Sequence, residues 1–407
     1  MMKQRSYFFG LISGVAIVLL TNYIFVNYIS AEFKGMSSIG DNSGSYADID
    51  DKLADIKKYI DTYYVRDYEE EKLLEKVEDA IYTTYVDSLE DVYTTYMNKE
   101  AYDSFNTSSD GNYVGIGIMA STAKDDGTVL VNTVFEGSPA EAAGIKAGDK
   151  IIGVEGVEEF PKDLQDAVAL IKGEEGTEVT VNIYRTSERE YLDITVERRA
   201  VEIPSVSAKM LEDNVGYIHI LSFDGVTTHQ FIDKYEELKN QNMERLIVDV
   251  RNNPGGRLDV VVDIASYLID EGTVLTVEDK KGKKAVYETN RKIEKLDIPF
   301  VMLINEFSAS ASEVLAGAVQ DTKSGMIIGK QSYGKGVVQK IFGLQDGSAL
   351  KITVSRYFTP NGVCIDGVGL TPDYEVEMDE ILTYQIQNLE FEEDVQLQKA
   401  FELVKEK

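Results

Sequence analysis

Residues 305–319 read Asn305-Glu-Phe-Ser-Ala-Ser310-Ala-Ser-Glu313-Val-Leu-Ala-Gly-Ala-Val319, and this stretch decides the fold. A continuous apolar run, Phe300-Val-Met-Leu-Ile304, precedes it and predicts a strand buried on both faces. Ser310, with Glu313 three positions later, forms the capping-box pattern of a helix start. The stretch therefore predicts a strand, a tight turn and a helix, with Ser310 at the turn.

Ser310 has two interpretations. An isolated S-x-x-E pattern most often marks only a helix cap. Backbone N–H groups at a helix start are unpaired, however, and favour developing negative charge, so a serine there has oxyanion donors beside it. The residues that follow the helix bear on the choice.

The downstream element Gly334-Lys335-Gly-Val-Val-Gln339 contains a candidate base. We expect a strand over 335–339, and its alternation would place Lys335, Val337 and Gln339 on one face. A lysine can act as general base for a serine if burial and neighbouring groups lower its pKa towards neutrality. A glutamine on the same face could orient the amine.

Two other kinds of site fit less well. Gly329 to Lys335 has the spacing G-x-x-x-x-G-K of a phosphate-binding loop, but Gly336 stands where that loop needs Ser or Thr. A Ser-His-Asp triad would require His219 or His229. The first alternates with apolar residues and the second lies near a predicted helix start, so we expect both histidines to be structural.

Three motifs, in this order along the chain, resemble the C-terminal processing peptidases, the PDZ-containing serine endopeptidases of family S41. They are Asp249-Val-Arg-Asn-Asn-Pro-Gly-Gly256, the run Ser308–Ala318, and the element Gly334–Gln339. The resemblance extends over nearly the whole chain beyond the N-terminus. It implies an acyl-enzyme mechanism with Ser310 as nucleophile, Lys335 as general base and Gln339 as the residue that orients the lysine.

The same resemblance implies an oxyanion hole formed by backbone N–H groups. One comes from Ala311 and the other from Gly255 or Gly256, between which the sequence does not choose. It also implies that the enzyme needs no metal and no other cofactor. The competing hypothesis is a membrane-tethered peptide-binding protein with an inactive protease-like core.

Residues 111–200 resemble a PDZ domain, which binds an extended peptide as an added strand and holds its C-terminal carboxylate with backbone N–H groups. Lys172 is a candidate for coupling peptide binding to the active site, although activation and inhibition by this domain both stay open. The segment expected to hold the peptide comprises Tyr113, Val114, Gly115, Ile116, Gly117 and Ile118.

The composition limits the class of protein. At 407 residues the chain is too long for one core. Its formal net charge of -30 argues against nucleic acid as a partner, and its single cysteine excludes an intramolecular disulfide or a Cys/His zinc cluster. We expect protein substrates that are unfolded or expose their C-termini. The helices near the two ends are equally compatible with a homodimer interface and with core packing.

The N-terminus predicts a membrane anchor. Lys3 and Arg5 precede a nearly uninterrupted apolar stretch, Tyr7 to Ile29, which is long enough to span a bilayer. We favour an uncleaved single-pass anchor over a cleaved signal, with the rest of the protein outside the cytoplasm.

The sequence thus predicts a multidomain α/β protein. Its expected parts are an anchor over 1–30, a linker over 31–45, a helical region over 46–110, the PDZ domain over 111–200, an α/β peptidase core over 201–375 and C-terminal helices over 376–407. Within the last part, the acidic run Glu390 to Asp394 is expected to form a solvated face.

Overall fold

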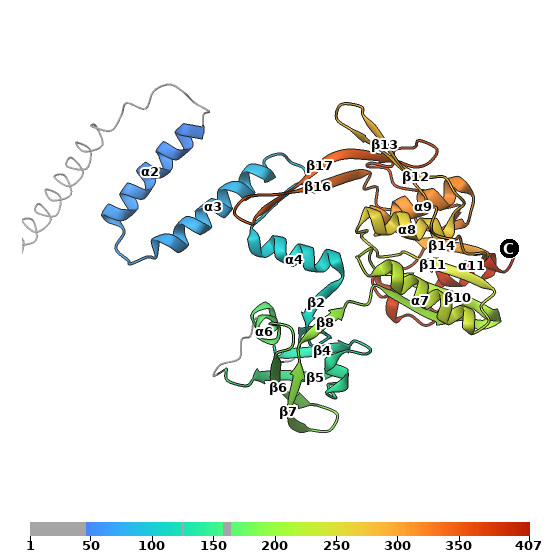
Figure 1. The fold of residues 1–407 in the computed structure, drawn as a ribbon, viewed down its shortest axis with the longest axis horizontal. Coiled ribbons are helices and arrows are strands. Elements are labelled where there is room, and N and C mark those ends of the chain that lie inside the picture. Colours follow the sequence, from blue (N-terminus) through green and yellow to red (C-terminus); the bar gives the residue numbers. More distant parts are fainter. Residues whose placement is uncertain (1–45, 124–125, 158–163) are drawn as a thin grey trace, which may run out of the picture. The chain divides into compact units, whose positions relative to one another are not determined.

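The computed structural model describes residues 46–407, apart from 124–125 and 158–163 (Figure 1). The chain divides into two compact units, residues 1–76 and 77–407. The predicted anchor and linker lie outside the described residues. Two helices predicted after the linker are present, α2 (Tyr46–Tyr63) and α3 (Glu70–Asp87). In the described part of the chain, no helix combines the length and the apolar character needed to cross a membrane.

A six-stranded sheet forms the centre of the second unit, in the order β18-β15-β14-β11-β10-β9. All neighbouring pairs are parallel except β10 and β9. Residues 300–304 form the predicted buried strand. The strands are β9 (Val206–Met210), β10 (Val215–Ile220), β11 (Arg245–Asp249), β14 (Phe300–Ile304), β15 (Met326–Gly329) and β18 (Tyr374–Glu375).

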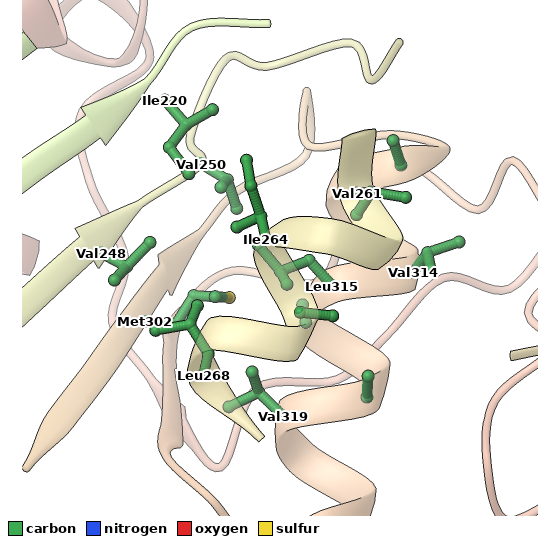
Figure 2. Close-up of a cluster of buried hydrophobic side chains, with 14 of the residues drawn as sticks. Ile220, Val248, Val250, Val261, Ile264, Leu268, Met302, Val314, Leu315 and Val319 are labelled. Atoms are coloured by element: carbon green, nitrogen blue, oxygen red, sulfur yellow. The ribbon is translucent and has the colours of Figure 1, made fainter. Parts of the chain in front are cut away.

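Helices cover both faces of this sheet, which explains why its strands are apolar throughout. Alternate residues of β11 enter different clusters, since Leu246 and Val248 pack with one set of helices and Ile247 with the other. Figure 2 shows the first cluster, where α8 and α9 lie against the strands. The helices are α7 (Thr227–Asn240), α8 (Leu258–Leu268) and α9 (Ala311–Thr322) on one face, and α11 (Val395–Val404) on the other.

A second sheet has the order β1-β17-β12-β13, and β16 also pairs with β17. Strand β1 comes from the region predicted to be helical, and the sequence gave no warning of it or of α4, which follows it. The elements are β1 (Thr95–Met97), α4 (Lys99–Asp110), β12 (Thr273–Asp279), β13 (Lys284–Glu288), β16 (Val337–Gly343) and β17 (Ala349–Phe358).

Residues between these two parts form a separate antiparallel sheet with its own buried cluster around Val131, Ile151 and Ile183. Short helices α5 (Pro139–Ala142) and α6 (Leu164–Ile171) accompany it, and β2 (Asn112–Gly115) pairs with β8 (Arg199–Glu202). The sheet strands are β3 (Ile118–Thr122), β4 (Val129–Val134), β5 (Asp149–Val154), β6 (Glu178–Arg185) and β7 (Glu190–Glu197).

The C-terminal region differs from the prediction in two ways. Helical structure is interrupted, because α10 (Glu380–Thr383) and a 3₁₀ turn, Ile386–Asn388, end before α11 begins. The acidic run is not entirely solvated, since Asp394 is buried. Asp394 caps α11 through the amide of Leu397 and also pairs with Arg251, so the prediction of a solvated face is wrong at this position.

Candidate active site

One cavity of about 480 Å³ brings the predicted catalytic residues together. It is lined by Ser310, Lys335 and Gln339, and also by Gly255, Gly256 and Ala311. Strands β11 and β14 are parallel neighbours, so the loops that follow them reach the same edge of the sheet. The topology therefore brings the Ser310 turn and the Gly255-Gly256 loop side by side.

Ser310 lies in a strained turn between β14 and α9. Its φ of 55° and ψ of -113° belong to a region that residues with a side chain rarely adopt. Such strain costs on the order of 1–3 kcal/mol and persists only where the surroundings enforce it. The hydroxyl of buried Tyr357 donates to the Ser310 carbonyl oxygen at 3.3 Å, which is one of the contacts that hold this turn.

Glu313 holds the Ser310 turn and the Lys335 loop together. Its carboxylate is fully buried and accepts from the backbone N–H of Ser310 and of Lys335, both at 2.9 Å. It also accepts from the Gly334 N–H at 2.7 Å and from the Ser332 hydroxyl at 2.5 Å. The predicted capping contact to Ser310 is thus one of four, and the other three fix the segment that carries the candidate base.

Lys335 is half-buried, and its ammonium lies 4.7 Å from the ring centre of Tyr93. Burial, and after it the nearby charge of Lys351, lower the pKa of Lys335, while the carboxylates of Glu313 and Asp91 act in the opposite direction. The environment therefore shifts this lysine in the direction that a general base needs.

The alternation predicted for residues 335–339 is wrong in detail. Strand β16 begins only at Val337, and its register against β17 shifts between Val338 and Gln339. A bulge re-aims the side chains that follow it. Gln339 still lines the cavity, but its amide nitrogen lies 3.4 Å from the Thr353 hydroxyl oxygen. Its role in orienting Lys335 stays a prediction.

The two glycines of the oxyanion loop differ in their hydrogen bonds. A methyl group at Gly255 would lie 2.8 Å from the Ser310 Cβ atom and 2.9 Å from the Ala311 nitrogen, so only glycine permits this approach. The Gly255 N–H donates to the Asn253 side chain at 2.8 Å. Within the described part of the chain, no acceptor pairs with the N–H of Gly256 or Ala311.

A buried charge network supports the same loop from the other side. Arg251 is fully buried and pairs with Asp249 at 2.6 Å and Asp394 at 2.7 Å. Tyr217 donates to Asp249, and Gln396 accepts from Arg251. The N-terminus of α11 is thereby joined to the strand end that leads to the oxyanion loop.

Neither histidine belongs to the cavity. His219 is buried, with Nε2 3.1 Å from the Arg251 carbonyl oxygen. His229 is exposed and lies 2.8 Å from Glu202. The environments agree with the structural roles expected for both residues, and a Ser-His-Asp arrangement at Ser310 is not formed.

Comparison with known proteins decides the family. The profile of Peptidase family S41 matches residues 214–376, and a PDZ domain profile matches residues 130–185. The carboxy-terminal processing protease CtpA of Bacillus subtilis (strain 168) is 33% identical over 380 residues, which cover 92% of this chain and 78% of that protein. The chain belongs to peptidase family S41.

Further relatives support the assignment. A probable CtpA-like serine protease of Staphylococcus aureus (strain MSSA476) is 34% identical over 374 residues, covering 91% of this chain and 72% of that protein. The solved photosystem II D1 C-terminal processing protease is 28% identical, with a TM-score of 0.45 over 80% of this chain and 86% of that one. This S41 peptidase is a serine-type endopeptidase of the C-terminal processing kind, with a PDZ domain.

The PDZ domain of the peptidase has a groove of about 270 Å³. Of the segment predicted to hold the peptide, Tyr113, Gly115, Ile116 and Ile118 line it, whereas Val114 and Gly117 are not among its lining residues. Lys172 lines it as well, with its ammonium 5.6 Å from the Tyr113 ring centre. Burial raises the pKa of Tyr113, partly offset by backbone N–H groups of Ile118 and Gly117.

Some functional residues of the peptidase escaped the sequence analysis. The capping box pointed to Glu313 but to only one of its four contacts. Tyr93 and Tyr357 carried no signal, because each reaches the site from a segment distant in sequence. Arg251 stood inside a recognised motif, where two oppositely charged residues two apart, Asp249 and Arg251, could have suggested a buried pair.

Proposed function

We propose that this peptidase hydrolyses protein substrates through a Ser310–Lys335 acyl-enzyme mechanism. The observation that carries the proposal is the shared cavity, in which a strained serine and a half-buried lysine with a lowered pKa meet. A buried carboxylate fixes the backbone of both residues, which favours a precise mutual geometry.

Neutral Lys335 accepts the proton of the Ser310 hydroxyl as its oxygen attacks the scissile carbonyl carbon. The protonated lysine then gives this proton to the leaving amine, and the acyl-enzyme forms. Water attacks the ester in the second half, again with Lys335 as the base. Gln339 is proposed to orient the lysine when substrate is bound.

The oxyanion of each tetrahedral intermediate is proposed to accept hydrogen bonds from backbone N–H groups. Ala311 and Gly256 are the better candidates, because the Gly255 N–H already donates to Asn253. Losing one such donor typically costs about 10²- to 10³-fold in rate. Gly255 contributes instead by allowing the loop to approach Ser310.

The PDZ groove is proposed to recruit substrates by their C-termini, with Lys172 near the bound end. Unfolded proteins fit this mode, because their C-termini are free to extend. We also propose that residues 1–30 anchor the chain in the cell membrane and that the peptidase part lies outside the cytoplasm. Lys3 and Arg5 before the apolar stretch favour this orientation.

The mechanism is tested with the full chain in detergent, acting on an unfolded protein in EDTA without ATP. We expect Ser310→Ala and Lys335→Ala each to abolish cleavage while leaving the circular dichroism spectrum unchanged. Lys340→Ala is a matched control, because Lys340 is an exposed lysine on the neighbouring strand. Cleavage retained in Lys335→Ala would remove this lysine as the base.

A silent wild-type protein is then assayed with added hydrophobic C-terminal peptides. Activity that appears only with peptide would make the PDZ domain an activator. Silence even with peptide would favour the inactive peptide-binding protein. For the location, protease added to intact cells should digest the peptidase part; complete protection would contradict the extracytoplasmic assignment.

A further inference from the structure

A second lysine, Lys351, lines the same cavity as Ser310 and Lys335. It lies on β17 opposite Ile341 of β16, and its ammonium is 5.5 Å from the ring centre of Phe105 on α4. The residue is half-buried. Within the described part of the chain, no carboxylate forms an ion pair with it.

Other lysines with shielded side chains in this protein have acidic partners. Lys150, with its side chain 14% exposed, lies 2.7 Å from Asp126. Lys330, 29% exposed, lies 3.1 Å from Glu377. A partly desolvated ammonium without a carboxylate is costly unless a ligand or water supplies acceptors. Lys351 is therefore unusual in a chain whose net charge is -30.

The whole cavity has the opposite charge balance to the chain. Its lining contains three basic residues, Arg257, Lys335 and Lys351, and one acidic residue, Asp224. Burial raises the pKa of Asp224, and Arg257 is already paired with Asp110 and Asp259. Lys335 is assigned to proton transfer. Lys351 is thus the cation of this cavity that stays available for a substrate anion.

Neutral groups on α4 complete the surroundings. Phe105, Ser108 and Ser109 all line the cavity, and their spacing of three and four residues places them on one helix face. The two serines offer hydroxyl donors, while Phe105 and Ile341 offer apolar surface. A cation beside hydroxyls and apolar walls suits a carboxylate on a peptide better than an isolated inorganic anion.

We propose that Lys351 binds a carboxylate of the peptide substrate inside the active-site cavity, and so makes the peptidase prefer an acidic group near the scissile bond. The inference deepens the proposed function and rests on it. The carboxylate has two possible sources, an acidic side chain or the free C-terminus of the substrate. If the PDZ groove holds the C-terminus during cleavage, only the side chain can supply it.

Lys351 also affects the base, so its removal has two consequences. Its charge helps to lower the pKa of Lys335, which in addition faces Glu313, Asp91 and the Tyr93 ring. Losing Lys351 therefore slows cleavage of every peptide near neutral pH. The preference between acidic and neutral versions of one peptide cancels this general effect and isolates the contact with the substrate.

The test uses the full chain in detergent and one parent peptide that it cleaves. Glutamine and glutamate are exchanged at each position flanking the scissile bond, and each peptide is made with a free and with an amidated C-terminus. We expect kcat/KM to be about tenfold higher for at least one acidic version, the size of a charge-assisted hydrogen bond at a partly exposed site. The version that shows the preference identifies the source of the carboxylate.

In Lys351→Met, the preference should fall to nearly onefold, and in Lys351→Arg most of it should remain because the positive charge is kept. Lys340→Met is the matched control, since Lys340 lies on the adjacent strand over Phe342 but outside the cavity. It should keep the full preference.

Two results would overturn the inference while leaving the proposed function intact: a wild-type enzyme that cleaves acidic and neutral versions equally, or an unchanged preference in Lys351→Met. Should Lys351→Met not fold, Lys351→Gln is judged by the same ratio. A wild type that cleaves no peptide, with or without an added PDZ ligand, would overturn both proposals together.

Discussion

Two fully buried charges flank the active site, and they are stabilised in different ways. Glu313 has no cationic side chain bonded to it and relies on four donors from the Ser310 turn and the loop of residues 332–335. Arg251 is neutralised by two carboxylates, Asp249 and Asp394, one of which comes from the distant start of α11. One charge therefore joins catalytic segments to each other, and the other joins the oxyanion loop to the scaffold.

The difference teaches what each charge contributes. A carboxylate held by backbone N–H groups fixes positions in the chain, so its loss should appear mainly in the rate. A buried ion pair fixes the packing of whole elements, so its loss should appear mainly in stability, because the partner charges stay buried without compensation.

The largest effect is expected from Arg251→Met. Removing the guanidinium leaves Asp249 and Asp394 buried without a cation, which should lower the free energy of unfolding by about 3–5 kcal/mol. Urea unfolding followed by circular dichroism measures the change. Arg257→Met is the control: its ion pairs are partly exposed, so we expect a loss of no more than about 1 kcal/mol. Equal losses in the two variants would contradict the distinction.

A smaller effect, on rate, is expected from Glu313→Gln. The amide that replaces one carboxylate oxygen faces N–H donors and cannot accept from them, so contacts to Ser310 or Lys335 are lost. We expect kcat/KM to fall about tenfold to a hundredfold, in line with one lost charge-assisted hydrogen bond. Glu306→Gln, in the same loop and bonded to Lys330, should leave the rate unchanged. A normal rate in Glu313→Gln would reduce Glu313 to a helix cap.

The smallest effect concerns the Lys335 ammonium, whose nearest aromatic contact is Tyr93. The ring favours the protonated lysine by about 0.5–1 kcal/mol, and the base acts when neutral. Tyr93→Leu should therefore lower the pKa of Lys335 further, so that the rate, which rises with pH as Lys335 loses its proton, rises about half a pH unit earlier.

The pH dependence of kcat/KM measures this shift, and Tyr93→Phe, which keeps the ring, should not move it. The charges of Lys351, Asp91 and Glu313 are unchanged in both variants. A shift to higher pH in Tyr93→Leu would show that the ring acts through burial and not through attraction of the cation.

Much of the core was predictable because its signals are local. Residues 215–220, 258–268 and 300–304 form the predicted elements with unchanged bounds, since apolar runs and periodicities are written within a few turns of chain. The small-residue turn at Ser310 and the Pro254-Gly-Gly256 loop likewise announce themselves by residue type.

The sequence by itself thus determined the α/β core, the motifs and the candidate nucleophile and base. Only the tertiary structure decided how these are held. Arg251 and Asp394 are 143 positions apart, and the Tyr93 and Lys335 segments are brought together by strands of one sheet. Local geometry limits a side chain to a few neighbours in sequence, whereas the partners of a buried charge are chosen when the sheets and helices pack.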